Sequence, residues 1–181
     1  MSSLLLVPIP PVEIEHILLL RPALQSTLNI ETAIDESIHL DIAAAFDAYR
    51  NQYNSSVLLT SLQEHFPHYN GKILGISKVD FFVPVLTYVF GEAQLNGTYA
   101  VVSTYRLSDT LYGLPENTQR FIERFRKEAV HELGHTFGLY HCLDYDCVMH
   151  SSTTVEDIDI KGDNFCPACG KIVKRHLHAR L

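Results

Sequence analysis

The stretch HELGHTFGLYHCLDYDCVM, residues 131–149, places three histidines, one glutamate, two cysteines and a methionine within nineteen positions. His131 and His135 are four residues apart, so on a helix their imidazoles project from one face. That spacing suits two nitrogens on one zinc ion. Glu132 lies about a quarter turn further round, where its carboxylate can reach a water at an open position of the metal. This is the general-base geometry of the H-E-x-x-H pattern.

A third ligand follows at a suitable distance along the chain. Gly138 can take the left-handed conformation that ends a helix and turns the backbone sharply. His141, three residues later, then reaches the same metal. H-E-x-x-H alone also occurs in helices that bind no metal, but the added glycine and histidine favour zinc. Three protein ligands and a water are typical of a catalytic zinc site.

The four cysteines form a second candidate site. All of them lie in the last quarter of the chain, at Cys142, Cys147, Cys166 and Cys169. In a cytoplasmic protein, closely spaced cysteines are more often metal ligands than disulfides. The C-x-x-C pair alone is also compatible with a redox motif. All four thiolates together predict a closed, structural Cys₄ zinc site.

These motifs carry a family resemblance. HELGHTFGLYH followed by CVM resembles the metzincin clan of zinc peptidases, with Met149 matching the methionine that packs beneath the histidines. Adding the cysteine pattern narrows the resemblance to the archaemetzincins, and it extends upstream through VFGEA, STYRL and KEAVHELGH, roughly the C-terminal half of the chain.

The resemblance implies two zinc ions per chain. Glu132 would be the catalytic base, and peptide bonds would be hydrolysed, with aminopeptidase-like cleavage as one form of the activity. Substrate would lie antiparallel to an edge strand in the hairpin region 86–105. The implied ligands of the catalytic zinc are His131, His135 and His141, and those of the structural zinc are Cys142, Cys147, Cys166 and Cys169.

The hydrophobic pattern predicts an α/β (α+β) domain with a twisted mixed sheet and an antiparallel edge strand. Strands are expected at 3–10, 30–40 and 72–82, with a hairpin over 86–107 turning at Asn96-Gly97. Helices are expected at 12–28, 55–66 and 115–139. The first is expected to end or kink at Pro22, and the second to be capped by Ser55 or Ser56. The last is the long active-site helix, with Pro115 in its first turn and Gly138 at its end.

We expect one domain over 1–181, in which 1–139 is an α/β part ending in the active-site helix and 140–181 is a short zinc-bound part. The loop that holds Asp144, Asp146, Glu156 and Asp157 is expected to be solvated rather than metal-binding. The basic end KIVKRHLHARL, residues 171–181, is expected to be a helix that caps the domain.

Composition limits the partners. The net charge of −7 argues against a nucleic-acid surface, and no apolar run is long enough to cross a bilayer. We therefore expect a cytoplasmic, monomeric enzyme with a peptide or protein substrate. Two alternatives stay open: a zinc- and peptide-binding protein of the same fold with low activity, and a zinc-ribbon-like interaction or nucleic-acid module.

Overall fold

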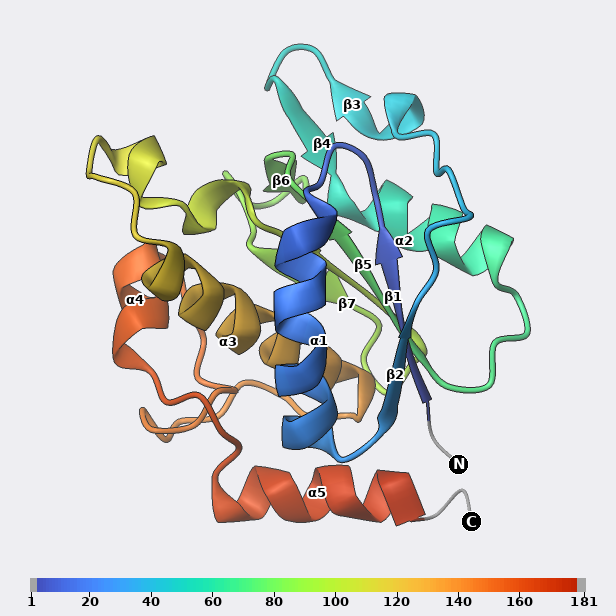
Figure 1. The fold of residues 1–181 in the computed structure, drawn as a ribbon, viewed down its shortest axis with the longest axis vertical. Coiled ribbons are helices and arrows are strands. Elements are labelled where there is room, and N and C mark those ends of the chain that lie inside the picture. The colour runs from blue at the N-terminus through green and yellow to red at the C-terminus, as the bar shows by residue number, and fades with distance from the viewer. Residues whose placement is uncertain (1–2, 179–181) are drawn as a thin grey trace.

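A five-stranded mixed sheet forms the centre of the computed structural model, which describes residues 3–178 (Figure 1). The three inner strands and one edge strand are parallel, and only the other edge strand, β7, runs antiparallel to its neighbour. In spatial order the strands are β2 (Glu31–Ile34), β1 (Ser3–Pro8), β5 (Lys72–Ser77), β8 (Tyr99–Ser103) and β7 (Gly91–Ala93). The predicted fold class is confirmed.

Helices cover both faces of this sheet, because its inner strands are apolar on both sides. Leu4 and Leu6 of β1 pack in one core with helices α1 (Ile14–Leu28) and α3 (Thr118–Thr136). Val7, from the opposite side of the same strand, packs in the other core with α2 (Ser55–His65). The result is a three-layer arrangement in which α3 lies beneath the sheet and close to β7 and β8 (Figure 1).

Two details of the first helices differ from the prediction. α1 does not end at Pro22 but continues to Leu28, where Asn29 adopts a left-handed φ of 53°. Its buried residues lie on both sides of the proline, so tertiary packing outweighs the local penalty. The cap of α2 is Asn54, whose side chain accepts from the Ser56 N–H, and not Ser55 or Ser56.

The predicted strand 72–82 is divided between two sheets. Its first part is β5, and Phe81–Phe82 forms β6 in a small second sheet that the sequence did not predict. That sheet has the order β3 (Phe46–Asp47), β4 (Gln52–Asn54), β6, and a short 3₁₀ helix, η1 (Ala43–Ala45), precedes it.

The hairpin prediction is confirmed. β7 and β8 pair antiparallel, and Asn96 takes the left-handed conformation, with φ 54°, in the turn between them. Its N–H donates to the carbonyl of His135 at 2.9 Å, which ties the turn to the end of α3. The edge strand and the active-site helix therefore run side by side.

Helix α3 begins later than predicted, because Asn117 and not Pro115 marks its start. The Asn117 side chain accepts from the Arg120 N–H at 3.0 Å. At the other end, Gly138 has a φ of 83°, donates to His135, and is followed by a bond from Leu139 N–H to the Gly134 carbonyl. This pair of bonds is a Schellman motif, so the predicted glycine stop is confirmed.

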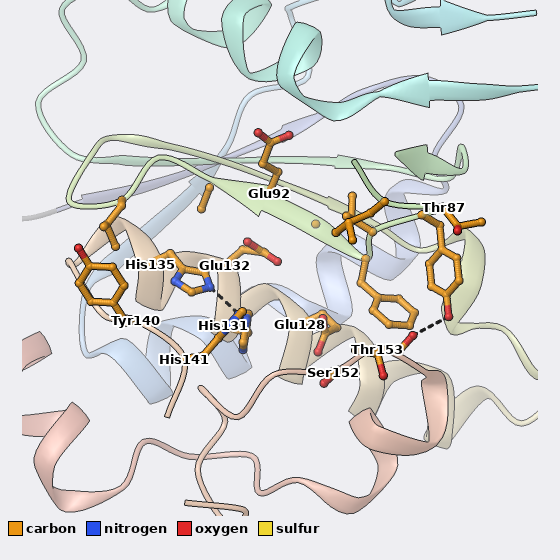
Figure 2. Close-up of a pocket in the computed structure, with 17 residues that line it drawn as sticks. Thr87, Glu92, Glu128, His131, Glu132, His135, Tyr140, His141, Ser152 and Thr153 are labelled. Atoms are coloured by element: carbon orange, nitrogen blue, oxygen red, sulfur yellow. Dashed lines mark hydrogen bonds between the residues drawn. The ribbon is translucent and has the colours of Figure 1, made fainter. Parts of the chain in front are cut away.

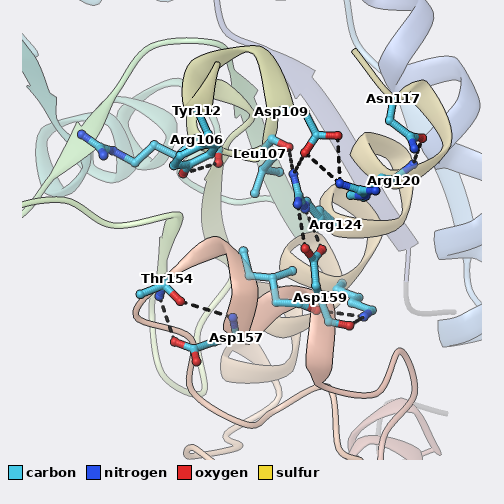
Figure 3. Close-up of polar contacts among 12 residues, drawn as sticks. Arg106, Leu107, Asp109, Tyr112, Asn117, Arg120, Arg124, Thr154, Asp157 and Asp159 are labelled. Atoms are coloured by element: carbon cyan, nitrogen blue, oxygen red, sulfur yellow. Dashed lines mark hydrogen bonds and ion pairs between the residues drawn. The ribbon is translucent and has the colours of Figure 1, made fainter. Parts of the chain in front are cut away.

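A buried arginine ties α3 to its surroundings (Figure 3). Arg124 binds the Asp159 carboxylate through two bonds of 2.7 Å each and donates to Asp109 at 2.8 Å. Asp109 belongs to the 3₁₀ helix η3 (Asp109–Tyr112), which follows η2 (Tyr105–Leu107), and Asp159 belongs to α4 (Val155–Ile160).

The prediction of a solvated loop through Glu156 and Asp157 is wrong, because both lie in α4. Thr154 and Asp157 form its capping box (Figure 3), a signal present in the sequence. Within the described residues the predicted C-terminal helix is present as α5 (Pro167–His178), and residues 179–181 of that prediction lie outside them. None of the helices within residues 3–178 has the length and apolarity needed to cross a membrane.

Candidate metal centres and the cleft between them and the sheet edge

The last two turns of α3 carry three of the predicted site residues. His131 and Glu132 are almost fully buried, at 5% and 6% exposure, and His135 lies one turn further on. The Schellman turn at Gly138 then reverses the chain and brings His141 back towards the helix. The structure thus joins the three histidines that the sequence spacing selected.

The geometry of the three imidazoles fits a single zinc ion. Their ring centroids form a nearly equilateral triangle with sides of 4.8, 5.1 and 5.2 Å. Nε2 of His131 lies 3.2 Å from Nε2 of His135. Two nitrogens that bind one tetrahedral zinc at about 2.0–2.1 Å are separated by about 3.3 Å, so this pair is spaced as ligands would be.

Backbone carbonyls orient two of these rings. Nδ1 of His131 donates to the Val148 carbonyl at 2.9 Å, and Nδ1 of His135 donates to the Leu139 carbonyl at 2.7 Å. Each bond leaves Nε2 as the free lone pair, which is the tautomer a metal requires. Burial lowers the pKa of His131 well below its usual range, and it also lowers the pKa of His135 and His141. Neutral, ligand-competent imidazoles are therefore favoured.

Glu132 lies between the helix and the sheet edge. It fits there because residue 91 is glycine: a Cβ at this position would lie 2.6 Å from the Glu132 Cγ. Burial raises the pKa of Glu132 well above its usual range, the nearby charge of Glu128 adds to the rise, and Lys161 opposes it. A carboxylate with a raised pKa is a stronger base than an exposed glutamate, which suits it to accept a proton.

The four cysteines form the second cluster. Their sulfur atoms all lie within 4.8 Å of one another, and none of the four forms a disulfide. Sγ of Cys142 lies 3.9 Å from Sγ of Cys166. Tetrahedral zinc with bonds of about 2.3 Å separates two thiolates by about 3.8 Å, so the spacing fits zinc. Cys166 directly precedes α5. The backbone N–H of Cys169, in the first turn of that helix, lowers the pKa of the Cys166 thiol.

The two clusters share a short segment of backbone. Cys147 is followed by Val148, whose carbonyl orients His131, and by Met149. Met149 accepts at its carbonyl from the N–H of Cys142, the residue after His141. Its fully buried side chain also packs on Gly134, where an added Cβ would lie 2.3 Å from the sulfur. The methionine therefore lies against the active-site helix, as its packing role predicts.

A cleft of about 560 Å³ lies between the β7 edge and α3. Figure 2 shows Glu132, His131 and His135 along its floor, with Tyr140 towards one end and Thr87 and Thr153 towards the other. Glu128 also lines it. Its carboxylate lies 2.7 Å from Nζ of Lys161, and both side chains are buried.

The Glu128–Lys161 pair was not predicted. Glu128 is one helical turn before Glu132, so its place on the active-site face is readable from the sequence. Lys161 gave no signal. Among the described residues, the groups able to hold a metal are the histidine and the cysteine clusters; neither Asp144 nor Asp146 belongs to them. His150 also lies outside both, with its Nδ1 3.0 Å from the Cys142 carbonyl.

Comparison with known proteins gives a consistent result. The chain is 40% identical over 151 residues to the archaemetzincin of Thermococcus kodakarensis, covering 82% of this chain and 79% of the relative. It is 41% identical over 127 residues to that of Methanocaldococcus jannaschii, covering 70% and 69%. Among solved structures, a zinc-dependent peptidase from Methanocorpusculum labreanum matches with a TM-score of 0.85 at 26% identity, covering 94% of this chain and 99% of that one. The archaemetzincin of Methanopyrus kandleri matches with a TM-score of 0.83 at 32% identity, covering 98% and 96%.

Fold, active-site helix and relatives together define a zinc metallopeptidase, a hydrolase of peptide bonds. The family model described as peptidase family M54 matches residues 28–175. The chain belongs to that family, and its curated relatives are archaemetzincins.

Proposed function

We propose that this protein hydrolyses peptide bonds at a zinc ion held by His131, His135 and His141, with Glu132 as the general base. The observation that carries the proposal is the convergence of three neutral imidazoles beside one buried carboxylate at the edge of a cleft. When bound, zinc supplies Lewis acidity, which polarises a carbonyl and lowers the pKa of water towards neutrality.

The chain's own residues supply proton transfer and orientation. Glu132 takes a proton from the attacking water and delivers it to the leaving amine. Burial raises the pKa of Glu132, which makes its carboxylate a stronger proton acceptor than an exposed glutamate. The Val148 and Leu139 carbonyls hold the histidine rings in position throughout, so little reorganisation is needed.

The β7 edge is suited to hold an extended peptide. The carbonyl of Phe90 and the N–H of Gln94 bond to β8, so by the alternation of an antiparallel ladder the backbone groups of Gly91 and Ala93 point away from β8. A peptide can add to this edge as a further strand. We propose the antiparallel direction that the family resemblance implies.

We further propose that Cys142, Cys147, Cys166 and Cys169 hold a second, structural zinc ion. Their sulfur spacing supports a closed tetrahedral site. In this proposal the chain is a single domain in which 140–181 depends on that zinc, because the segment lacks an extended core of its own. The cysteine site then positions His141 and the segment around Met149.

The proposed substrate is a peptide or protein, with neither nucleic acid nor membrane as partner. Four unpaired thiols support a reducing, cytoplasmic setting, and the net charge of −7 supports a monomer. Aminopeptidase-like cleavage is one form of the proposed activity, and peptide binding with little turnover is the alternative.

A peptide library with free and blocked N-termini, incubated with zinc-loaded protein, tests the proposal. Cleavage detected by mass spectrometry should disappear in Glu132→Gln while both metals stay bound. Loss of cleavage on blocking the N-terminus would identify an aminopeptidase. Undiminished cleavage by Glu132→Gln would overturn the role of the base, and peptide binding without cleavage by the wild type would favour the alternative.

A further inference from the structure

The cleft has a feature at one end that the peptidase reaction does not itself require. The hydroxyl of Tyr88 donates to the carbonyl of Thr153 at 2.6 Å. Tyr88 precedes β7 on one wall of the cleft, and Thr153 lies on the opposite wall. In Figure 2 the dashed line that reaches Thr153 marks this bond, on the far side of Glu128 from His135 and Tyr140. The bond joins the two walls and narrows the cleft at that end.

The Tyr88 side chain is held in this position independently of Thr153. The Arg106 guanidinium stacks on its ring, 3.9 Å from the centroid, and Phe90 meets the ring edge-on at 5.6 Å. Arg106 is itself fixed by two bonds of 2.6 Å to the Asp80 carboxylate. A cation stacked on a tyrosine face is attracted to the ring, so the ring is preorganised.

The acceptor of this bond, Thr153, is also held in place by hydrogen bonds. The N–H of Thr153 donates to the Asp157 carboxylate at 2.8 Å, and its hydroxyl donates to the same oxygen at 2.9 Å. Asp157 also closes the capping box of α4. Both partners of the bond across the cleft are thus fixed by separate elements, so the closure is a built part of the fold.

We propose that Tyr88 limits how far a substrate extends beyond the scissile bond on its C-terminal side. This inference rests on the proposed function and on the antiparallel direction at β7. In that direction, the part of the peptide after the scissile bond runs from Gly91, beside Glu132, towards Tyr88. Strand pairing on this edge ends at Gly91, because the Val89 N–H already donates to the Phe81 carbonyl at 2.9 Å. Gly91 and Tyr88 are three positions apart in the sequence, about 10 Å at roughly 3.3 Å per residue. About two or three substrate residues fit there.

At the other end of the cleft the Asn96 N–H donates to the His135 carbonyl, but within the described residues no side-chain hydrogen bond joins the two walls there as the Tyr88 hydroxyl does. Tyr140 and Leu95 line that end, and both side chains are exposed, at 74% and 44%. The difference between the two ends indicates a substrate that is a short peptide or the C-terminal end of a longer chain. Cleavage would release a fragment of about two or three residues from the C-terminal side.

Two series of peptides around one cleavage site test the inference. One series lengthens the peptide by one to six residues after the scissile bond, and the other lengthens it before that bond. Turnover is measured with the wild type, and affinity is measured by calorimetry with zinc-loaded Glu132→Gln, which reports binding without cleavage. We expect kcat/KM and affinity to fall about tenfold or more once the C-terminal extension passes three residues, and to change little along the other series.

Variants of Tyr88 separate steric closure from a general effect on the fold. In Tyr88→Ala the fall along the C-terminal series should disappear, and in Tyr88→Phe, where Arg106 still holds the ring, it should be reduced but present. Tyr112→Phe is the matched control, because its hydroxyl donates to the Arg106 carbonyl away from the cleft, and it should retain the wild-type pattern.

The results distinguish this inference from the proposed function. Length-dependent binding without any turnover would support the closure and remove the peptidase proposal. Equal use of long and short C-terminal extensions by the wild type, or a length dependence unchanged in Tyr88→Ala, would overturn the closure and leave the peptidase standing. Failure of any peptide of either series to bind would also overturn the closure.

Discussion

Replacing Cys166 with serine should weaken both metal sites, although Cys166 touches none of the three histidines. The substitution removes one thiolate from the cysteine cluster. In the wild type the Sγ of Cys166 lies 3.9 Å from the Sγ of Cys142. Loss of that zinc frees the segment through Cys147, and with it the Val148 carbonyl that orients His131 at 2.9 Å. It also frees Cys142, the residue joined to His141.

The size of the effect follows from these contacts. Loss of a group that orients a metal-bound histidine typically lowers metal affinity 10- to 100-fold. This corresponds to about 1.4–2.7 kcal/mol in the binding free energy of the catalytic zinc. His135, oriented by Leu139 of the helix-ending turn, is untouched, so the site should weaken and not vanish.

Zinc content per chain, measured by plasma mass spectrometry after dialysis against buffers of graded chelator strength, follows both sites. The wild type should hold two ions, and Cys166→Ser should lose the first ion readily and the second at a 10- to 100-fold lower chelator strength than the wild type. Glu132→Gln, which keeps all seven proposed ligands, is the control and should retain two. A Cys166→Ser protein that loses one ion and holds the other with wild-type affinity would refute the linkage.

Three further changes test other parts of the structure. Gly91→Ala places a Cβ 2.6 Å from both the Glu132 Cγ and the Val101 carbonyl oxygen. The substitution should cost about 1–3 kcal/mol of stability in thermal unfolding and lower kcat/KM at least about tenfold. Turnover equal to that of the wild type would contradict the close approach. Arg124→Ala removes the buried partner of Asp109 and Asp159. Because Asp109 keeps Arg120 at 3.4 Å and Asp159 is 36% exposed, the cost should be about 3 kcal/mol, the lower end for a broken buried pair. Arg124→Lys should restore only part of this, because lysine lacks the two-pronged geometry, and a loss below about 1 kcal/mol would count against a supporting role. In zinc-free protein, the pKa of His131 lies well below 6.5 in the folded state, so the unfolded chain binds a proton that the folded chain refuses. The lowered pKa values of His135 and His141 act in the same direction and the raised pKa of Glu132 opposes them, so the wild type is compared with His131→Gln. As the pH drops below about 6.5, urea unfolding should show the wild type losing up to about 1.4 kcal/mol per pH unit relative to His131→Gln. Equal slopes in the two proteins would contradict the burial argument.

The sequence predicted which candidate ligands lie together better than it predicted the details of the fold, for a physical reason. Metal ligands must meet at one point, so their spacing along a helix and past a glycine turn is constrained within a few residues of each other. That is why His131, His135 and His141 could be selected together and why the structure brings them into one cluster. The cysteines are further apart, but paired spacing and the lack of a competing disulfide context selected the same four residues.

Features that depend on distant contacts were missed. The continuation of α1 past Pro22 is decided by packing on both sides of the proline, which no local pattern reports. The small second sheet uses strands of two or three residues, too short for a period to be read. Lys161 pairs with Glu128 across 33 positions of sequence, and Tyr88 reaches Thr153 across 65, so neither partner could be inferred from its neighbours.

The most direct test is a crystal structure of the zinc-loaded protein with anomalous data on both sides of the zinc absorption edge. We expect one ion about 2.0–2.1 Å from a nitrogen of each of His131, His135 and His141, with Glu132 nearby but not bound to it and one coordination position free of protein. We expect a second ion about 2.3 Å from the four sulfurs. A first ion that is not bound by His141, or whose fourth position is filled by a protein side chain, would contradict the proposed catalytic site.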